Sequence, residues 1–147
     1  MDENFAIQVS SHLKNMLPSH QFLTTNELGL EGEKDLQLFP KLKNLEIDAI
    51  VTHDLRHMED ADETMSLFEN NMHWIGMKQT RQGTAGVTAI ALQSAALLSA
   101  LPMILGDWRT EPTMYKVIGI QRAPQDRFRA RALSDVVRTH ALRRART

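Results

Sequence analysis

A short apolar run ends in polar residues that could bind a metal ion. Ala49, Ile50 and Val51 have the character of a buried strand, and Thr52 and Asp54 follow where that strand would meet solvent. Ligands of parallel α/β sheets lie beyond such carboxyl ends. Asp54 is therefore a candidate metal ligand. An Asp at this place can equally cap the helix that follows, so its role depends on which other carboxylates converge on it.

The residue types restrict the kind of metal. The chain has no cysteine, which excludes disulfides and thiolate sites and leaves oxygen or imidazole as ligands. Such ligands favour hard cations, Mg²⁺ or Mn²⁺. His53 and His57 lie close to Asp54, but no third His or Cys stands at metal-ligand spacing beside them. We therefore expect both histidines to be exposed.

The elements that must position these residues alternate along the chain. Apolar periodicity predicts helices over residues 2–17, 34–43, 59–70, about 84–101 and 124–146. Strands are predicted over residues 21–25, 48–52, 73–77 and 113–120. Pro40 should kink or divide the second helix, and Met65 and Phe68 should face inward from the third. This alternation indicates βαβ units and an α/β fold with a parallel sheet.

Length and composition favour one soluble domain. The chain has 147 residues, 42% of them hydrophobic, which suits a single packed core. The first residues lack the basic and apolar regions of a secretory signal. The most hydrophobic segment, from Ala85 to Leu105, is interrupted by polar residues and Pro102, so we expect no membrane span. A cytoplasmic location is the simplest interpretation.

Charge is distributed unevenly. Residues 122–147 contain eight Arg and two Asp, a local net charge of +6, while the remaining residues carry −7. An Arg-rich helix could bind nucleic-acid phosphates, and such binding would weaken with added salt. It could equally dock on an acidic surface, either its own or that of a partner.

Three segments together suggest a family. Asp2-Glu-Asn4, the segment L-G-L-E-G-E-K-D that ends at Asp35, and the segment from Ala49 to Asp54 resemble the PIN-like nuclease domains. The likeness is strongest to a small prokaryotic group with the pattern D-E-N, L-G-L-x-G-x-x-D and I-x-T-x-D. Residues 91–102 and 111–117 resemble the closing helix and last strand of that group.

The resemblance implies a three-layer α/β/α sandwich with a mainly parallel sheet. The PIN-like domain would span residues 1–121, and the Arg-rich C-terminal helix would span residues 122–147. In the family a hydrophobic strand leads into D-E-N, whereas here only Met1 precedes Asp2. Either the domain lacks this first strand, or the chain starts further upstream.

The resemblance also implies a site and an activity. Asp2, Asp35 and Asp54 would bind Mg²⁺ or Mn²⁺ and catalyse hydrolysis of RNA, as in an endoribonuclease toxin of a toxin–antitoxin pair. The additional candidates for the site are Glu3, Asn4 and Asp60, and those for RNA contact are Lys78 and Arg81. An antitoxin protein and a homodimer are the protein partners that this interpretation allows.

Two alternatives stay open. A catalytically inactive PIN-like module would bind without cutting. A two-component receiver domain is the other, because the segment from Asp48 to Met58 also resembles a strand that carries a phosphoacceptor Asp, with Asp2 and Glu3 as its acidic pair. The Gly and Pro expected after the phosphoacceptor are missing, as is the Lys at the end of the last strand.

Overall fold

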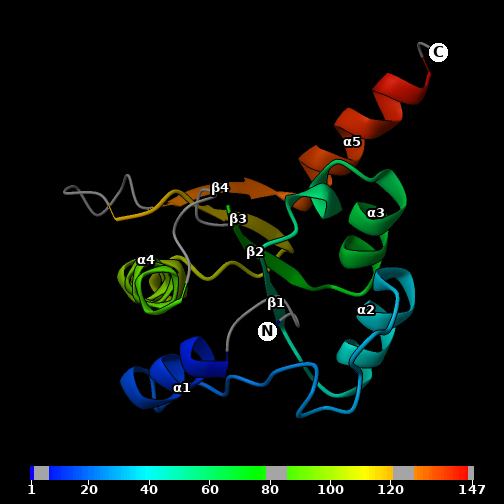
Figure 1. Ribbon diagram of the computed structural model, residues 1–147. Coiled ribbons are helices and arrows are strands. Elements are labelled where there is room, and N and C mark those ends of the chain that lie inside the picture. The colour runs from blue at the N-terminus through cyan, green and yellow to red at the C-terminus, as the bar shows by residue number, and fades with distance from the viewer. Residues whose placement is uncertain (2–6, 79–85, 121–127, 146–147) are drawn as a thin grey trace.

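The computed structural model describes residues 1, 7–78, 86–120 and 128–145. It shows an α/β fold with a four-stranded, mostly parallel sheet flanked by five helices (Figure 1). The strand order is β1-β2-β3-β4, and only β4 runs antiparallel to its neighbour. The strands are β1 (Ala49–Thr52), β2 (His73–Met77), β3 (Thr113–Val117) and β4 (Phe128–Ala132).

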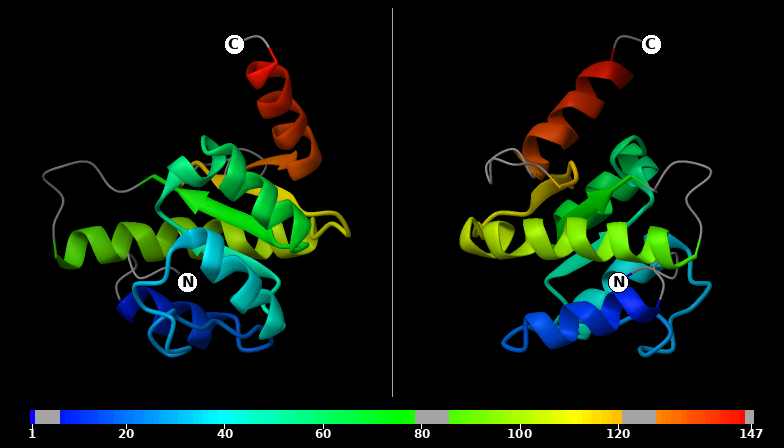
Figure 2. Two further views of the ribbon diagram at one scale, coloured as in Figure 1. Left: turned by 90° about the vertical axis from the view of Figure 1, so that its right-hand side faces the viewer. Right: turned by 60° about the vertical axis from the view of Figure 1, so that its left-hand side comes forward.

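Helices cover both faces of the sheet. On one face, α1 lies beside α4 and shares a core cluster with it (Figures 1 and 2). On the other face, α2, α3 and α5 share a second cluster. The helices are α1 (Ile7–Met16), α2 (Asp35–Asn44), α3 (Ala61–Glu69), α4 (Val87–Gly106) and α5 (Leu133–Arg144), with a short 3₁₀ helix, η1 (Leu55–Met58), after β1.

The C-terminal segment corrects the prediction of one helix over residues 124–146. Residues 128–132 form β4, which pairs with β3, and α5 begins only at Leu133. The reason lies in the local pattern, because partly buried Phe128 and Ala130 alternate with exposed Arg129 and Arg131. That period of two is typical of a strand.

Three other predictions also differ from the structure. Residues 21–25 form no strand, and α2 continues through Pro40 without a break. Met65 and Phe68 are each 37% exposed, so they do not face inward as predicted. Thr64 and Leu67 are the buried residues of α3.

A glycine in β2 makes room for the largest buried side chain. Trp74 is 1% exposed, and its ring lies over Gly76, the next residue on the same face. A Cβ at position 76 would stand only 1.9 Å from the Trp74 ring. Gly76 therefore fixes where the indole lies.

Helix α4 is long and apolar enough to cross a membrane, judged by length and composition alone. In the structure its buried residues pack in the core beside α1 and the sheet. These residues include Ala96, Leu97, Ala100, Leu101 and Ile104.

Guanidinium groups of the C-terminal segment contact the protein's own oxygen atoms. Arg144 pairs with Asp62 of α3 across 3.1 Å, and Arg131 donates to the Thr139 hydroxyl across 2.7 Å. Arg138 pairs with Asp135 within α5. Of these three contacts, the Arg144–Asp62 pair joins the segment to the rest of the chain, and the other two lie within the segment itself.

Candidate functional site

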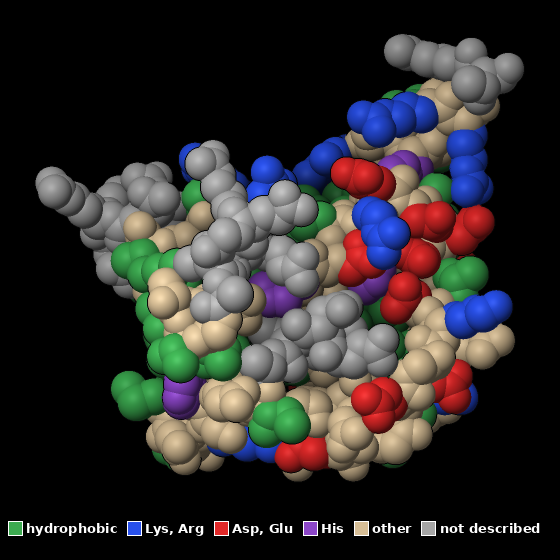
Figure 3. Space-filling model, in the orientation of Figure 1, with side chains coloured by type: hydrophobic (Ala, Val, Ile, Leu, Met, Phe, Trp, Pro, Cys, Tyr) green, Lys and Arg blue, Asp and Glu red, His purple; other side chains and the backbone are tan. Residues whose placement is uncertain are grey.

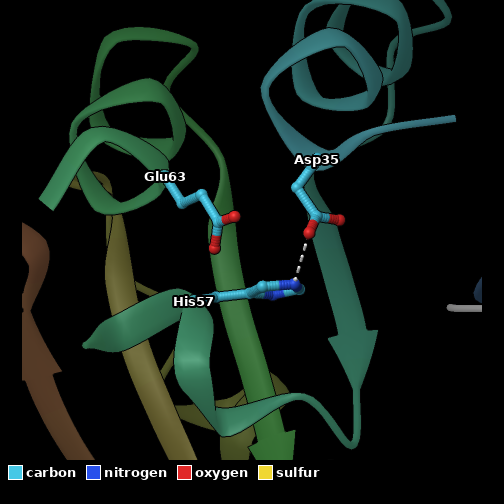
Figure 4. A group of neighbouring side chains, drawn as sticks. All are labelled: Asp35, His57 and Glu63. Carbon is cyan, nitrogen blue, oxygen red and sulfur yellow. Dashed lines mark ion pairs between the residues drawn. The ribbon is translucent and has the colours of Figure 1, made fainter. Parts of the chain in front are cut away.

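Three side chains that could hold a cation converge beside the C-terminal end of β1. Asp35, His57 and Glu63 each offer one ligand atom, and these atoms all lie within 4.8 Å of one another. The Nε2 atom of His57 lies 3.2 Å from a carboxylate oxygen of Asp35. Figure 4 shows the two carboxylates pointing toward the imidazole from separate helices. We call these three residues the Asp35 cluster.

Helix ends explain why the two carboxylates meet. Asp35 is the first residue of α2, and Glu63 stands in the first turn of α3. The N-terminus of a helix carries a partial positive charge, which stabilises carboxylates placed there. The α2 and α3 helices pack against each other on one face of the sheet. The partial positive charges at their N-termini therefore act on two carboxylates, Asp35 and Glu63, that are neighbours in space.

His57 is buried, which corrects the prediction that it is exposed. Its exposed fraction is 2%, and the edge of its ring packs against Phe39 of α2. The indole N–H of Trp74 donates to His57 Nδ1 across 3.4 Å. Nδ1 must therefore be the accepting nitrogen, so the ring proton is on Nε2 and points at Asp35. In this state His57 holds the Asp35 carboxylate and does not offer a lone pair to a metal.

Glu63 lies partly buried among other carboxylates. Burial raises the pKa of the Glu63 carboxyl above its usual value, against an opposing effect of His57. The negative charges of Asp35, Asp60 and Asp54 raise the pKa further. Carboxylates that repel one another in this way would gain from a bound cation.

Asp54 caps the 3₁₀ helix, as its position after the strand also suggested. Its carboxylate accepts from the backbone N–H of Arg56 across 2.9 Å and from the Arg56 guanidinium. Hydrogen bonds from the Arg56 side chain lower the pKa of Asp54 to about 2. Its charge also acts on His57 and Glu63, so Asp54 lies at the border of the Asp35 cluster.

The other predicted site residues have separate places. Asp60 caps α3 by accepting from the backbone N–H groups of Asp62 and Glu63. Lys78 is exposed immediately after β2. Asp2, Glu3, Asn4 and Arg81 lie outside the described residues.

His53 is also buried, contrary to prediction. Its exposed fraction is 8%, and its Nδ1 lies 3.2 Å from the backbone oxygen of Met77 at the end of β2. It joins the ends of β1 and β2 and is not part of the Asp35 cluster.

Sequence reasoning missed Glu63 and His57. Glu63 carried a usable signal, because it is an acidic residue in the first turn of the helix after β1. Nothing in the local pattern indicated that His57 is buried. Figure 3 shows acidic side chains gathered over α2 and α3, with basic side chains beside them.

Comparisons of the chain with protein-family models, curated proteins and solved structures found no match.

Proposed function

We propose that the protein is a divalent-metal-dependent endoribonuclease of PIN-like type, built as a three-layer α/β/α sandwich. The observation that carries the proposal is the convergence of Asp35 and Glu63 beside the end of β1, with His57 fixed between them. Asp35 and Asp54 are also two of the carboxylates that the PIN-like resemblance implies.

The donor set fits Mg²⁺ or Mn²⁺. Mg²⁺ is commonly bound through one or two carboxylates and completes its shell with water. Asp35 and Glu63 would supply these carboxylates, and Asp54 lies near enough to act on Glu63 through its charge. A bound divalent ion supplies a water of lowered pKa and neutralises charge on phosphoryl oxygens.

The chain's own residues have distinct roles in this proposal. His57 donates to Asp35 from Nε2 and so keeps one Asp35 oxygen engaged while the other is left to a cation. Arg56 has a side chain that is 83% exposed beside the carboxylates. Its guanidinium can donate hydrogen bonds to two oxygens of an RNA phosphate in a bidentate geometry. Lys78 offers a second exposed cation after β2.

The biological setting that we propose is that of a cytoplasmic toxin held inactive by an antitoxin protein, as in the family that the chain resembles. A homodimer is compatible with that setting. The sequence motifs that resemble the PIN-like family support this setting.

Cleavage of RNA in the presence of Mn²⁺ tests the activity. Wild type should cut a mixed-sequence RNA, and chelation of the metal should stop it. Asp35→Asn and Glu63→Gln should each lower the rate by about 10²-fold or more if these carboxylates hold the ion. Glu69→Gln, at the exposed far end of α3, is the matched control and should cut normally. Equal rates for all four proteins would overturn the proposal.

One observation favours an inactive PIN-like binding module as the second candidate. Arg56 engages both oxygens of Asp54, which withdraws a carboxylate that the family uses as a ligand. RNA binding by wild type without cleavage, unchanged by Mn²⁺, would support this second function.

A further inference from the structure

Two cations stand opposite each other on neighbouring strands, near the carboxyl end of β3. Lys116 of β3 pairs in register with Arg129 of β4, so both side chains leave the same face of the sheet. Lys116 is partly exposed, and Arg129 is exposed. The neighbours of Arg129 along β4, Phe128 and Ala130, pack in the core cluster of α1 and α4. The two cations therefore face the other side of the sheet, where α2, α3 and α5 lie. We call Lys116 and Arg129 the basic pair.

The basic pair is short of negative charge. Side chains directly opposite each other on antiparallel strands have Cβ atoms about 5 Å apart, and like charges in these positions destabilise a sheet. Neither cation forms an ion pair with a residue in the described part of the chain. Arg131, on the same face of β4, donates to two uncharged oxygens, the Thr139 hydroxyl and the Asp135 carbonyl. A bound anion would relieve the repulsion at this surface.

The register of the sheet connects the basic pair to the end of β1. One residue from each strand, in the order of the sheet, makes up a row: Thr52, Gly76, Lys116 and Arg129. Neighbouring strands are about 4.8 Å apart, so the row crosses about 14 Å. Lys78 follows the end of β2, which lies between β1 and β3. Because the Asp35 cluster lies beside the end of β1, the row leads from the basic pair toward the candidate cation site.

The surroundings of the row favour a phosphate chain over an acidic protein segment. In Figure 3, basic side chains lie over β4 and α5, and the acidic side chains of α2 and α3 lie beside them. A segment rich in Asp and Glu would be repelled as it passed from the first group to the second. A magnesium site of one or two carboxylates commonly takes substrate phosphate oxygens as further ligands. A chain of phosphates therefore suits both ends of the row.

We propose that the basic pair binds the phosphate backbone of the RNA substrate, whose strand then runs across the strand ends toward the Asp35 cluster. About four stacked nucleotides, at a rise of about 3.4 Å each, would cover the row. Contacts to phosphate position a strand without reading its sequence, so this surface would bind RNA of any sequence. The path toward the Asp35 cluster rests on the proposed nuclease function, whereas binding to the basic pair requires neither metal nor cleavage.

Fluorescence anisotropy in the presence of a chelator tests the binding step without cleavage. The probe is a labelled single-stranded RNA of about ten nucleotides. The double substitution Lys116→Gln and Arg129→Gln should weaken binding about tenfold or more, because two charge-assisted contacts are lost. The plot of log K against log salt should become shallower by about 1.4, since each phosphate contact on a single strand contributes about 0.7 to its slope.

A matched double substitution controls for the change in net charge. Lys43 and Arg109 precede β1 and β3, so they lie toward the opposite edge of the sheet from the basic pair. Lys43→Gln combined with Arg109→Gln removes the same charge and should leave the affinity and its salt dependence unchanged. Equal affinities of the two double variants, or no binding of the RNA by wild type, would overturn the proposal.

Arg129→Glu separates RNA binding from folding. It places an opposite charge across from Lys116, which should stabilise the pairing of β3 with β4 and raise the midpoint of urea unfolding. RNA binding should nevertheless fall further than in Arg129→Gln, because the new carboxylate repels phosphate. A variant that both unfolds more easily and binds RNA weakly would trace the loss to impaired folding and overturn the role of the basic pair.

The remaining outcomes distinguish this inference from the proposed activity. If wild type cuts RNA with Mn²⁺, the Lys116 and Arg129 double variant should raise KM about tenfold with little change in kcat, since binding common to ground and transition states is lost. Cleavage with an unchanged KM would overturn the inference and leave the nuclease proposal standing. Binding through the basic pair without cleavage would support the surface and refute the nuclease. A polyglutamate peptide that binds through the pair more tightly than RNA would assign the surface to an acidic protein and overturn the proposal.

Discussion

The indole N–H of Trp74 donates to Nδ1 of His57 across 3.4 Å, and this contact determines which imidazole nitrogen carries the proton. With Nδ1 accepting, the proton on Nε2 points at Asp35, 3.2 Å away. Trp74, which is buried in β2, thereby determines which nitrogen of His57 faces Asp35 with a proton. It also makes the metal preference of the cluster testable.

Trp74→Phe should shift that preference toward Zn²⁺. Without the indole donor, the proton can move to Nδ1, and the Nε2 lone pair becomes a ligand that suits Zn²⁺ better than Mg²⁺. We expect Zn²⁺ affinity to rise about tenfold relative to Mg²⁺, the lower end of effects of residues around metal ligands. Calorimetric titration measures the two affinities, and ¹⁵N chemical shifts of His57 report the tautomer. An unchanged tautomer and an unchanged affinity ratio would contradict the argument.

Gly76→Ala should destabilise the protein by about 1–3 kcal/mol, because the new methyl group would overlap the Trp74 ring in a packed core. Urea unfolding measures the loss, and near-ultraviolet circular dichroism reports displacement of the indole. Gly106→Ala, at the end of α4, is the matched control, since a Cβ there meets no atom within 4 Å. Equal stabilities of the two variants would show that the β2 glycine is not needed for packing.

Glu63→Gln should stabilise the metal-free protein at pH 7. Burial and neighbouring carboxylates raise the pKa of Glu63 in the folded state, so its protonated form is the one that folding favours. That contribution is complete below the ordinary pKa of 4.5 and is lost as pH rises through the folded pKa. The gain from Gln should therefore vanish below about pH 4. The free energy of unfolding, measured at pH 7 and below pH 4, gives the difference, and Glu69→Gln is the control. A gain in stability that persists in acid would contradict a raised pKa of Glu63.

Arg56→Gln should return the Asp54 pKa from about 2 toward its ordinary value of 3.8. A lowered carboxyl pKa stabilises the folded state above pH 3.8, and that contribution is lost as pH falls toward 2. Because the Arg56 side chain is 83% exposed, solvent screens the pair, and the loss of stability at neutral pH should be small. A carboxyl NMR titration measures the pKa. Arg109→Gln, which breaks a similar pair with Asp107, should leave Asp54 unchanged.

Two substitutions of Asp60 test whether this residue only caps α3 or also binds the metal. Asp60→Ala removes the acceptor for two backbone N–H groups and should cost about 1 kcal/mol, whereas Asp60→Ser should retain most of the stability. Neither should change Mn²⁺ affinity more than about twofold if the residue only caps, since surface charges are screened. Thermal unfolding and metal titration measure the two quantities. A large loss of Mn²⁺ affinity in the Ser variant would make Asp60 a ligand.

Local pattern was enough to predict much of the fold. The strand at β1, the strand at β2 and the helix that begins near Asp35 follow from apolar periodicity and polar boundaries, which act between near neighbours. The same reasoning placed Asp54 at a strand end, where it caps η1. It failed over residues 124–146, where pairing with β3 outweighed a helical composition.

What the sequence by itself determined is the supply of ligands: oxygen and imidazole without thiolate, and an acidic residue at the start of two helices. Only the tertiary structure decided which of these meet. Asp35 and Glu63 are brought together because α2 and α3 pack on one face of the sheet. His57 points at them because Trp74 lies over Gly76 and holds the ring. Such contacts join residues far apart in the chain, so no local pattern of residues records them.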